Sequence, residues 1–260
     1  LNHLGHAGLL KRVIGGHWGL VPKIGQLALS NQIEAYNFPQ GVICHLMRES
    51  AAGRPGVFTK IGMETFIDPI HDGGRLNART TVPLISRIEL DGEPWLWYRS
   101  FPVHVGLIRG TAADPFGNLM LDEEAIIGEV LPIAQAARNS GGIVLAQVKR
   151  LLNEPLPPHR VRVPGILVDA VVLADNEHHW QTFGERHNRQ YFEPTATFGD
   201  TMCATGTASA LPIVHAESSI TVKTLAVPVA HNPAGAFTGI APMPWDERRI
   251  IAARACDELH

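Results

Sequence analysis

A largely apolar run in the middle of the 260-residue chain sets the strongest limit on its fold. Residues 143–148, IVLAQV, follow the pair Gly141-Gly142, which is typical of the end of a helix. Such a run predicts a strand that is covered on both faces, as in the centre of a parallel sheet. Residues 166–173 predict another strand of this kind. We therefore expect an α/β fold with a mostly parallel sheet flanked by helices.

The amino-terminal region predicts two helices on either side of a glycine-rich turn. Residues 4–13 have roughly helical apolar spacing and predict a helix that leads into GGHWG, residues 15–19. Pro22 stands where a first helical turn accepts proline, and the apolar residues up to Ala28 predict a buried face for the helix it opens. In His17 the turn carries a proton-sensitive ring, which either bonds to the backbone of its own loop or contacts a ligand.

A strand, a polar turn and a helix follow in that order. Residues 33–36 predict a short buried strand, residues 37–41 (NFPQG) a turn, and Val42 lies near the start of a helix. This order places ligand groups at the carboxyl ends of parallel strands. Asn37, Gln40 and Gly41 are therefore candidates for ligand contacts, although such a turn can also serve only to cap its helix.

The middle of the chain departs from the alternation of strands and helices. Residues 85–90 and 94–98 flank Asp91-Gly92, which predicts an antiparallel hairpin, or flap. Residues 103–108 predict a strand, and Glu123-Glu124 predict the start of a helix that runs to about residue 138, with its acids at the positive end.

Charge and composition exclude several classes of protein. A formal net charge of -3 and a pI near 6.5 give no basic field for nucleic acid, so we expect small-molecule ligands. No run of about 18 apolar residues and no signal-peptide pattern is visible, so we expect no membrane span and a cytoplasmic protein. The three widely spaced cysteines suggest neither disulfides nor zinc.

Other polar clusters give weaker signals. Neither common nucleotide-binding fingerprint is present. His178-His179 lack the spacing of a metal site, so we expect no metal. Glu64 and Asp68 lie four residues apart in a long irregular loop, where their spacing does not define a carboxylate pair.

Taken in order, several motifs resemble one family. The chain is similar, from residue 4 to about residue 191, to the acetate/propionate type of class I coenzyme A transferase. The segments that carry the resemblance are GGHWG, AYNFPQG, TKIGMETFIDP, GGRLN, GTAADPFGN, IAQAARNSGGIVLAQV, VPGILVDAVV and HHWQTFGE. Residues 246–259 resemble the helix that opens the second half of these two-part enzymes.

The resemblance implies a ping-pong exchange of coenzyme A between a short-chain acyl-CoA and a carboxylate such as acetate or propionate. A glutamate carboxylate forms first an acyl anhydride and then a glutamyl-CoA thioester. The family pattern assigns Gln40 to the catalytic edge beside this glutamate and His17, Trp18, Asn37 and Gly41 to the substrate cleft. Coenzyme A is a substrate there, and no further cofactor is expected.

The resemblance also implies missing parts. The family's first strand and glycine-rich loop would precede Leu1, and its nucleophilic glutamate belongs to a second half after this chain. We therefore expect residues 1–194 to form an incomplete α-half domain, residues 195–244 a linker-like or loosely ordered extension with short strands at 220–224 and 225–229, and residues 245–260 a helix resembling the start of the β-half. The partners would be acyl-CoA, a carboxylate and a β-half or second subunit, in an oligomer.

Two other functions remain open. The chain could be a non-catalytic or degenerate partner subunit that binds acyl-CoA or another chain, since it lacks the nucleophile. A sugar-phosphate isomerase rests on fold analogy alone, and the Ser, Thr and Lys anion loop that it requires is not found.

Overall fold

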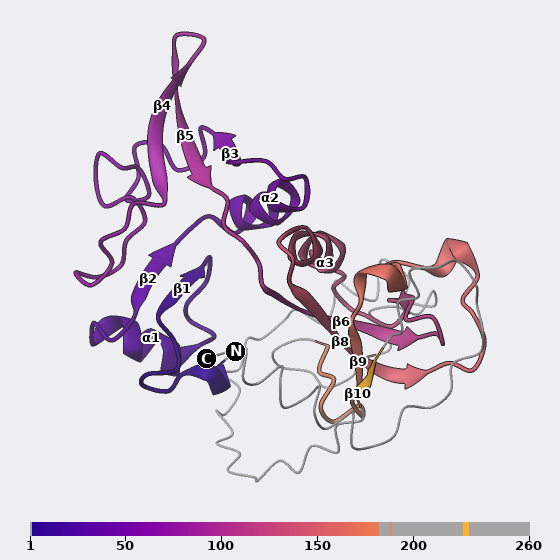
Figure 1. Ribbon diagram of the computed structural model, residues 1–260. Helices are drawn as coiled ribbons and strands as arrows, with labels where there is room; N and C mark the ends of the chain where they lie inside the picture. The colour runs from indigo at the N-terminus through magenta and orange to yellow at the C-terminus, as the bar shows by residue number, and fades with distance from the viewer. Residues whose placement is uncertain (1, 182–187, 189–225, 229–260) are drawn as a thin grey trace, which may run out of the picture. The chain divides into compact units, whose positions relative to one another are not determined.

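The computed structural model describes residues 2–181, 188 and 226–228 (Figure 1). By its contacts the chain divides into two compact units. Unit 1 comprises Leu1–His104 and Gln135–Gly142, and unit 2 comprises Val105–Ala134 and Ile143–His260. The expected domain boundaries after residues 194 and 244, the strand at 220–224 and the helix at 245–259 lie outside the described residues.

Unit 1 opens with a strand–helix–strand–helix series. After a short 3₁₀ helix, η1 (Asn2–Leu4), come β1 (Arg12–Gly15), α1 (Pro22–Leu29), β2 (Glu34–Asn37) and α2 (Gln40–Ala51). Strands β1 and β2 pair in parallel. The predicted helix at Pro22, the strand at 33–36 and the helix near Val42 are confirmed, and Pro22 stands in the first turn of α1 as expected.

The expected helix over residues 4–13 is wrong. Gly8 has a φ of +84°, which does not fit a helix, and a side chain at Gly5 would meet Lys23 Cβ at 2.6 Å. The β-branched Val13 and Ile14 instead belong to β1, where they pair with Ala35 and Tyr36 of β2. Pairing with a strand more than 20 residues away thus outweighs the local helical spacing.

An antiparallel sheet forms the predicted flap of unit 1. Its strands are β3 (Gly56–Thr59), β4 (Ile85–Leu90) and β5 (Glu93–Arg99), in the order β3-β5-β4. The tight turn between β4 and β5 places Asp91 and Gly92 at φ values of +54° and +75°. These are the conformations that an Asp-Gly hairpin turn requires, so the predicted hairpin is confirmed.

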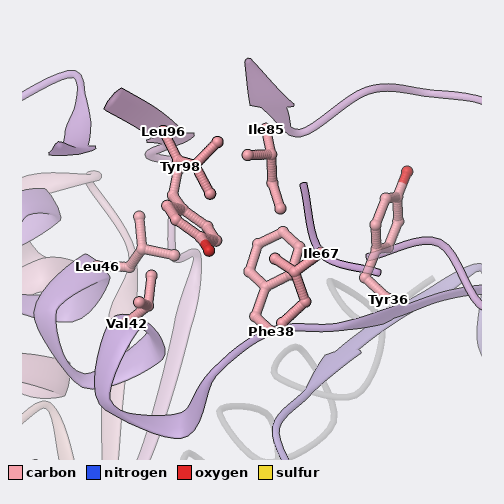
Figure 2. Close-up of a cluster of buried hydrophobic side chains, with 8 residues drawn as sticks. All are labelled: Tyr36, Phe38, Val42, Leu46, Ile67, Ile85, Leu96 and Tyr98. Atoms are coloured by element: carbon pink, nitrogen blue, oxygen red, sulfur yellow. The ribbon is translucent and has the colours of Figure 1, made fainter. Parts of the chain in front are cut away.

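The core of unit 1 joins β2, α2, the loop after β3 and the flap. Its buried members are Tyr36, Phe38, Val42, Leu46, Ile67, Ile85, Leu96 and Tyr98. Figure 2 shows Phe38 and Ile67 in the middle, with Tyr98 on one side and Tyr36 on the other. Phe38 meets both tyrosine rings edge to face, with ring centroids 5.4 Å from Tyr98 and 6.0 Å from Tyr36. The residue that follows β2 is thereby fixed in the core.

Unit 2 is built on a sheet with the strand order β10-β9-β8-β6-β7. The strands are β6 (Val105–Ala113), β7 (Leu119–Met120), β8 (Ile143–Leu151), β9 (Ala170–Leu173) and β10 (Ala226–Pro228). β8 pairs in parallel with both β6 and β9, while the two edge strands are antiparallel. The predicted central parallel strand at 143–148 is confirmed.

Two boundaries differ from the expectation. Helix α3 (Val130–Asn139) begins seven residues after Glu123, because Glu123 and Glu124 pair with cations of β6 and β8 and Gly128, at φ +59°, precedes the helix. The predicted strand at 166–173 begins only at Ala170: the 3₁₀ helix η3 (Gly165–Leu167) comes first, where the Gly165 amide donates to Asn118. A further 3₁₀ turn, η2, spans Pro158–Arg160.

Among the described residues no helix is both long and apolar enough to cross a membrane.

Candidate functional site

Two turns of unit 1 lie together because the strands that precede them are parallel. The register of β1 and β2 sets Gly15 opposite Asn37, and the Phe38 amide donates to the Gly15 carbonyl at 3.1 Å. The carboxyl ends of paired parallel strands meet at one edge of a sheet. GGHWG and NFPQG, which the sequence placed 22 residues apart, therefore start from the same edge.

Gly16 of the first turn packs directly against Gln40 of the second. A Cβ atom at Gly16 would lie 2.6 Å from Oε1 of Gln40 and 3.1 Å from its Cα. Any side chain at position 16 would therefore displace Gln40 or its backbone. Glycine is needed at this point for the close packing of the two turns, which keeps the Gln40 side chain at their junction.

Gln40 is the first residue of α2, and it is exposed. No side chain caps this helix: Pro39 precedes it, and the amides of Val42 and Ile43 both donate to the Pro39 carbonyl. The side-chain amide of Gln40 has one long contact, 3.9 Å from Nε2 to Sγ of Cys44. The start of a helix carries partial positive charge, so the Gln40 amide and this helix end favour the same kind of ligand, an anion or an oxyanion.

A third motif, GGRLN, runs along the other side of β2. The Asn37 amide donates to the Gly74 carbonyl at 2.8 Å, and the Leu76 amide donates to the Ala35 carbonyl at 2.9 Å. A Cβ at Gly74 would meet the Asn37 carbonyl oxygen at 2.8 Å, and its φ is +72°. Glycine is therefore required beside Asn37, and three separate motifs converge on the end of β2.

The long loop that ends at GGRLN is organised around Asp68. The Asp68 carboxylate is fully buried, accepts the amides of Glu64 and Ile70, and lies 3.2 Å from the Arg87 guanidinium. Glu64 has a φ of +60° and pairs with the same arginine at 2.7 Å. Asp68 and Glu64 thus shape the loop around Arg87, which accounts for both carboxylates without a catalytic role.

Tyr98 closes the same loop from the flap. Its hydroxyl donates to the Ile61 carbonyl at 2.7 Å. Burial, and next the negative charge of Asp68, raise the pKa of Tyr98 to about 12. The phenol therefore stays protonated at neutral pH and can keep donating to this loop.

The remaining residues of the predicted site occupy different environments. His17 is exposed, and its Nε2 would lie 3.1 Å from a Cβ at Gly19, so the ring turns back on its own loop. Trp18 is half-buried and packs against the cluster under α1, beside Val13 and Val21. Its indole Nε1 is buried and has no hydrogen-bond partner in the described part of the chain. Gly41 is exposed next to Gln40 in the first turn of α2.

Unit 2 contains a buried polar cluster that the sequence analysis missed. Glu124 accepts hydrogen bonds from Nε2 of His179 at 2.8 Å and from Nε of Arg109 at 2.9 Å, and Thr111 Oγ1 lies at 3.4 Å. The side chains of Glu124 and His179 are 1% and 0% exposed. Gln147 of β8 completes this group, which we name the Glu124 network.

Both ring nitrogens of His179 have a side-chain neighbour. Nε2 of Gln147 donates to the His178 carbonyl at 3.1 Å, so its amide nitrogen faces the imidazole, where it lies 3.2 Å from Nδ1 of His179. Nε2 of the same ring faces Glu124, so both ring nitrogens lie within hydrogen-bond distance of a side chain. His179 thereby holds this segment of the chain in place.

The charge of Glu124 is favoured despite its burial. Burial is the largest influence and raises its pKa, but the hydrogen bond and charge of His179, together with Arg109 and Lys149, lower the pKa below its ordinary value. The pKa of Lys149 is lowered, chiefly by burial, and the negative charges of Glu124 and Glu123 offset part of that effect. Glu124 is therefore a carboxylate in the folded protein.

Comparisons with known proteins agree with the motifs. A family model described as "Coenzyme A transferase" matches residues 1–174. The caffeate CoA-transferase of Acetobacterium woodii is 43% identical over 261 aligned positions, which cover 100% of this chain and 43% of that protein. The acetate CoA-transferase YdiF of Escherichia coli K12 is 41% identical over 174 residues, 66% of this chain and 33% of that one. The chain spans less than half the length of these relatives.

A solved structure shares the fold. The thioester complex with CoA of the acyl-CoA transferase YdiF from Escherichia coli O157:H7 has a TM-score of 0.71 and 38% identity, covering 76% of this chain and 38% of that one. The glutaconate coenzyme A-transferase of Acidaminococcus fermentans has a TM-score of 0.53 at 18% identity, which shows likeness of fold alone. The expected α/β class is thereby confirmed.

Proposed function

Because the chain belongs to the coenzyme A transferase family, we propose that it supplies the Gln40-bearing half of an enzyme that exchanges coenzyme A between an acyl-CoA and a carboxylate. A short-chain acyl group and an acid such as acetate or propionate are the substrates that we propose. The observation that carries this proposal is the packing of Gly16 against Gln40, which presents an exposed amide at the start of α2.

The proposed chemistry begins at a glutamate outside this chain. Its carboxylate attacks the thioester carbonyl, the C–S bond breaks, and an acyl–glutamyl anhydride and the CoA thiolate form. The thiolate then attacks the glutamyl carbonyl and releases the acyl group as a carboxylate, which leaves a glutamyl-CoA thioester. A second carboxylate takes up CoA by the same steps in reverse. A series of easier displacements thus replaces one direct exchange.

Gln40 suits the role of a donor to this glutamate. Each displacement passes through a tetrahedral centre on which an oxygen becomes negative, and fixed hydrogen-bond donors stabilise that oxygen. A primary amide donates two hydrogens and does not titrate, so it neither neutralises the glutamate nor competes for a proton. The uncapped start of α2 adds partial positive charge at the same place.

His17, Trp18, Asn37 and Gly41 are proposed to contact the substrate beside Gln40. Asn37 precedes the start of α2 and Gly41 follows Gln40 in it, and the Asn37 amide donates to the Gly74 carbonyl. His17 is exposed, and Trp18 is half-buried with an indole Nε1 that has no hydrogen-bond partner in the described residues.

Two relatives are named for different acids, acetate and caffeate, so more than one acid is a candidate acceptor of coenzyme A. The proposal of acetate or propionate rests on the resemblance of the motifs, and a partner carrying the β-half, in a cytoplasmic oligomer, is part of the same proposal. Subunits named alpha occur among the relatives, such as that of the Escherichia coli K12 acetate CoA-transferase, which is 25% identical over 175 residues. A non-catalytic subunit that only binds acyl-CoA or a partner is the alternative.

Replacing Gln40 by alanine tests the proposal. We expect the Gln40→Ala chain to bind acetyl-CoA about tenfold more weakly in isothermal titration, because one hydrogen bond to a polarised oxygen contributes on the order of 1.4 kcal/mol. Gln26→Ala, which changes an exposed glutamine within α1, is the matched control and should bind as the unaltered chain does.

Three outcomes separate the candidates. Equal affinities of the Gln40 and Gln26 variants would remove Gln40 from the site. Binding of acetyl-CoA without any exchange into acetate, even after a β-half is added, would favour the non-catalytic subunit. Borohydride trapping followed by mass spectrometry should show a reduced glutamate on the β-half and none on this chain.

A further inference from the structure

A cavity of about 490 Å³ lies in unit 1 beside the GGRLN motif. Its walls come from one stretch of chain and include Asp72, Arg75, Asn77 and Thr81. It is lined mainly by polar and charged side chains, unlike an acyl pocket, which would be apolar. Its chemistry therefore suits a charged part of a ligand.

Arg75 is the cation in the lining of this cavity, and its side chain is exposed. Its Nε donates to the Asp72 carbonyl at 2.6 Å, which holds one edge of the guanidinium. Within the described residues its terminal nitrogens have no hydrogen-bond partner. A guanidinium held at Nε still offers its two terminal nitrogens as a fork, and this fork matches two oxygens of a phosphate.

Asn77 and Thr80, which also line the cavity, are held by bonds to α1, β2 and the residue between them. Nδ2 of Asn77 donates to the carbonyls of Ala28 and Ile33 at 2.7 and 3.0 Å, and its Oδ1 accepts from the Thr80 hydroxyl at 2.6 Å. The Thr80 hydroxyl also accepts the buried Ala35 amide at 2.7 Å. The cavity is thus preformed, so a ligand does not have to order it.

The balance of charge along this stretch favours an anion. Between positions 72 and 81 stand two cations, Arg75 and Arg79, and one acid, Asp72. Asp72 also lines the cavity and opposes an anion there, which limits the expected affinity. The Thr81 hydroxyl is a further donor in the lining that makes no hydrogen bond within the described residues.

The position of the cavity relates it to Gln40. GGRLN runs antiparallel to β2, with Gly74 beside Asn37 and Asn77 beside Ile33. Arg75 itself forms a β-bridge with Tyr36, the residue before Asn37, so the cavity lies along the same strand that leads into the Gln40 turn. A ligand that reaches both places needs a reactive group and an anion in one molecule. Coenzyme A has this form, with a thiol at one end of its pantetheine arm and phosphates at the other.

We propose that this cavity binds a phosphate group of the coenzyme A substrate through Arg75. That the phosphate belongs to coenzyme A rests on the proposed function. That the cavity binds a phosphate group does not rest on it. The Arg75 fork receives the phosphate, Thr81 donates to it, and the wall of Asn77 and Thr80 keeps the cavity open. Arg75 and Gln40 would then contact two different parts of the same ligand.

The test compares ligands that differ only in their phosphates. In isothermal titration with the full chain, Arg75→Gln is expected to weaken coenzyme A binding about tenfold and 3′,5′-ADP binding by a similar factor, while pantetheine, which lacks phosphate, binds unchanged. Arg48→Gln is the control: it removes an exposed cation from α2, outside the cavity, and should leave all three affinities unchanged.

The outcomes separate this proposal from the proposed function. Unchanged binding of coenzyme A and 3′,5′-ADP to Arg75→Gln would overturn the phosphate site, whatever Gln40→Ala does. A loss of 3′,5′-ADP and inorganic phosphate binding without any binding of coenzyme A would confirm a phosphate site for free anions and overturn coenzyme A as its ligand. An equal loss of pantetheine binding would show that Arg75 acts through folding, and thermal unfolding of the variant would display the same loss.

Discussion

Glu124→Ala should destabilise the protein by about 3–5 kcal/mol, because it leaves the buried His179 and the partly exposed Arg109 without their shared acceptor. The segment from Asp175 to Gln181 depends on this acceptor: Arg109 also donates to the Trp180 carbonyl, and Gln181 to the Glu123 carbonyl. The free energy of unfolding in urea, compared with that of the unaltered chain, measures the effect.

Matched variants and pH identify the cause. Glu124→Gln keeps the shape but not the charge, so it should cost less than Glu124→Ala. Since the folded state lowers the pKa of Glu124, its contribution is complete above the ordinary carboxyl pKa of 4.5 and is lost as the pH falls through the lowered value. The unaltered chain should therefore lose this share of its stability in acid, and Glu124→Gln should not. Equal acid dependence of both proteins would contradict the charge assigned to Glu124.

Val144→Asp should destabilise the protein by about 4 kcal/mol or more, since it removes a buried apolar side chain and buries a charge without a partner. Val144 is 0% exposed in β8, which has a neighbouring strand on each side. Chemical unfolding followed by far-ultraviolet circular dichroism gives the change in free energy.

Leu107→Asp is the control for this change. Leu107 belongs to β6 in the same sheet, but its side chain is 65% exposed, so the same aspartate should cost about 1 kcal/mol or less. Similar losses for both variants would mean that Val144 is not in the core, or that aspartate is poorly tolerated anywhere in this sheet.

The sequence predicted the elements whose signals are local. Each of these elements is marked by a turn signal or a periodicity within a few neighbouring residues. They are the helix at Pro22, the turn around Gln40, the Asp91-Gly92 hairpin and the apolar run at 143–148. β1 was missed because its strand conformation depends on β2, which lies 22 residues later in the chain. Apolar spacing alone cannot report such a partner.

The candidate site was predicted in part. The motifs named the residues around Gln40, but the contact of Gly16 with Gln40 and the run of GGRLN beside Asn37 depend on strand register. The Glu124 network was missed for a related reason. In the sequence, Glu124 is interpreted as an acid at the start of a helix and His179 as one of two adjacent histidines. In the fold their side chains lie 2.8 Å apart. Gln147 and Thr111, polar residues within strands of a central sheet, were the available signal.

The central claim is that the amide hydrogens of Gln40 face the carboxyl chemistry of the substrate. The most direct measurement is the side-chain ¹H–¹⁵N resonance of Gln40 while acetyl-CoA is added to the labelled full chain. We predict that this resonance shifts in proportion to binding, while that of Gln32, whose amide donates to Ser30 Oγ at 3.0 Å, does not. If acetyl-CoA binds and the Gln40 amide resonance stays where it was, Gln40 does not meet the substrate and the claim is contradicted.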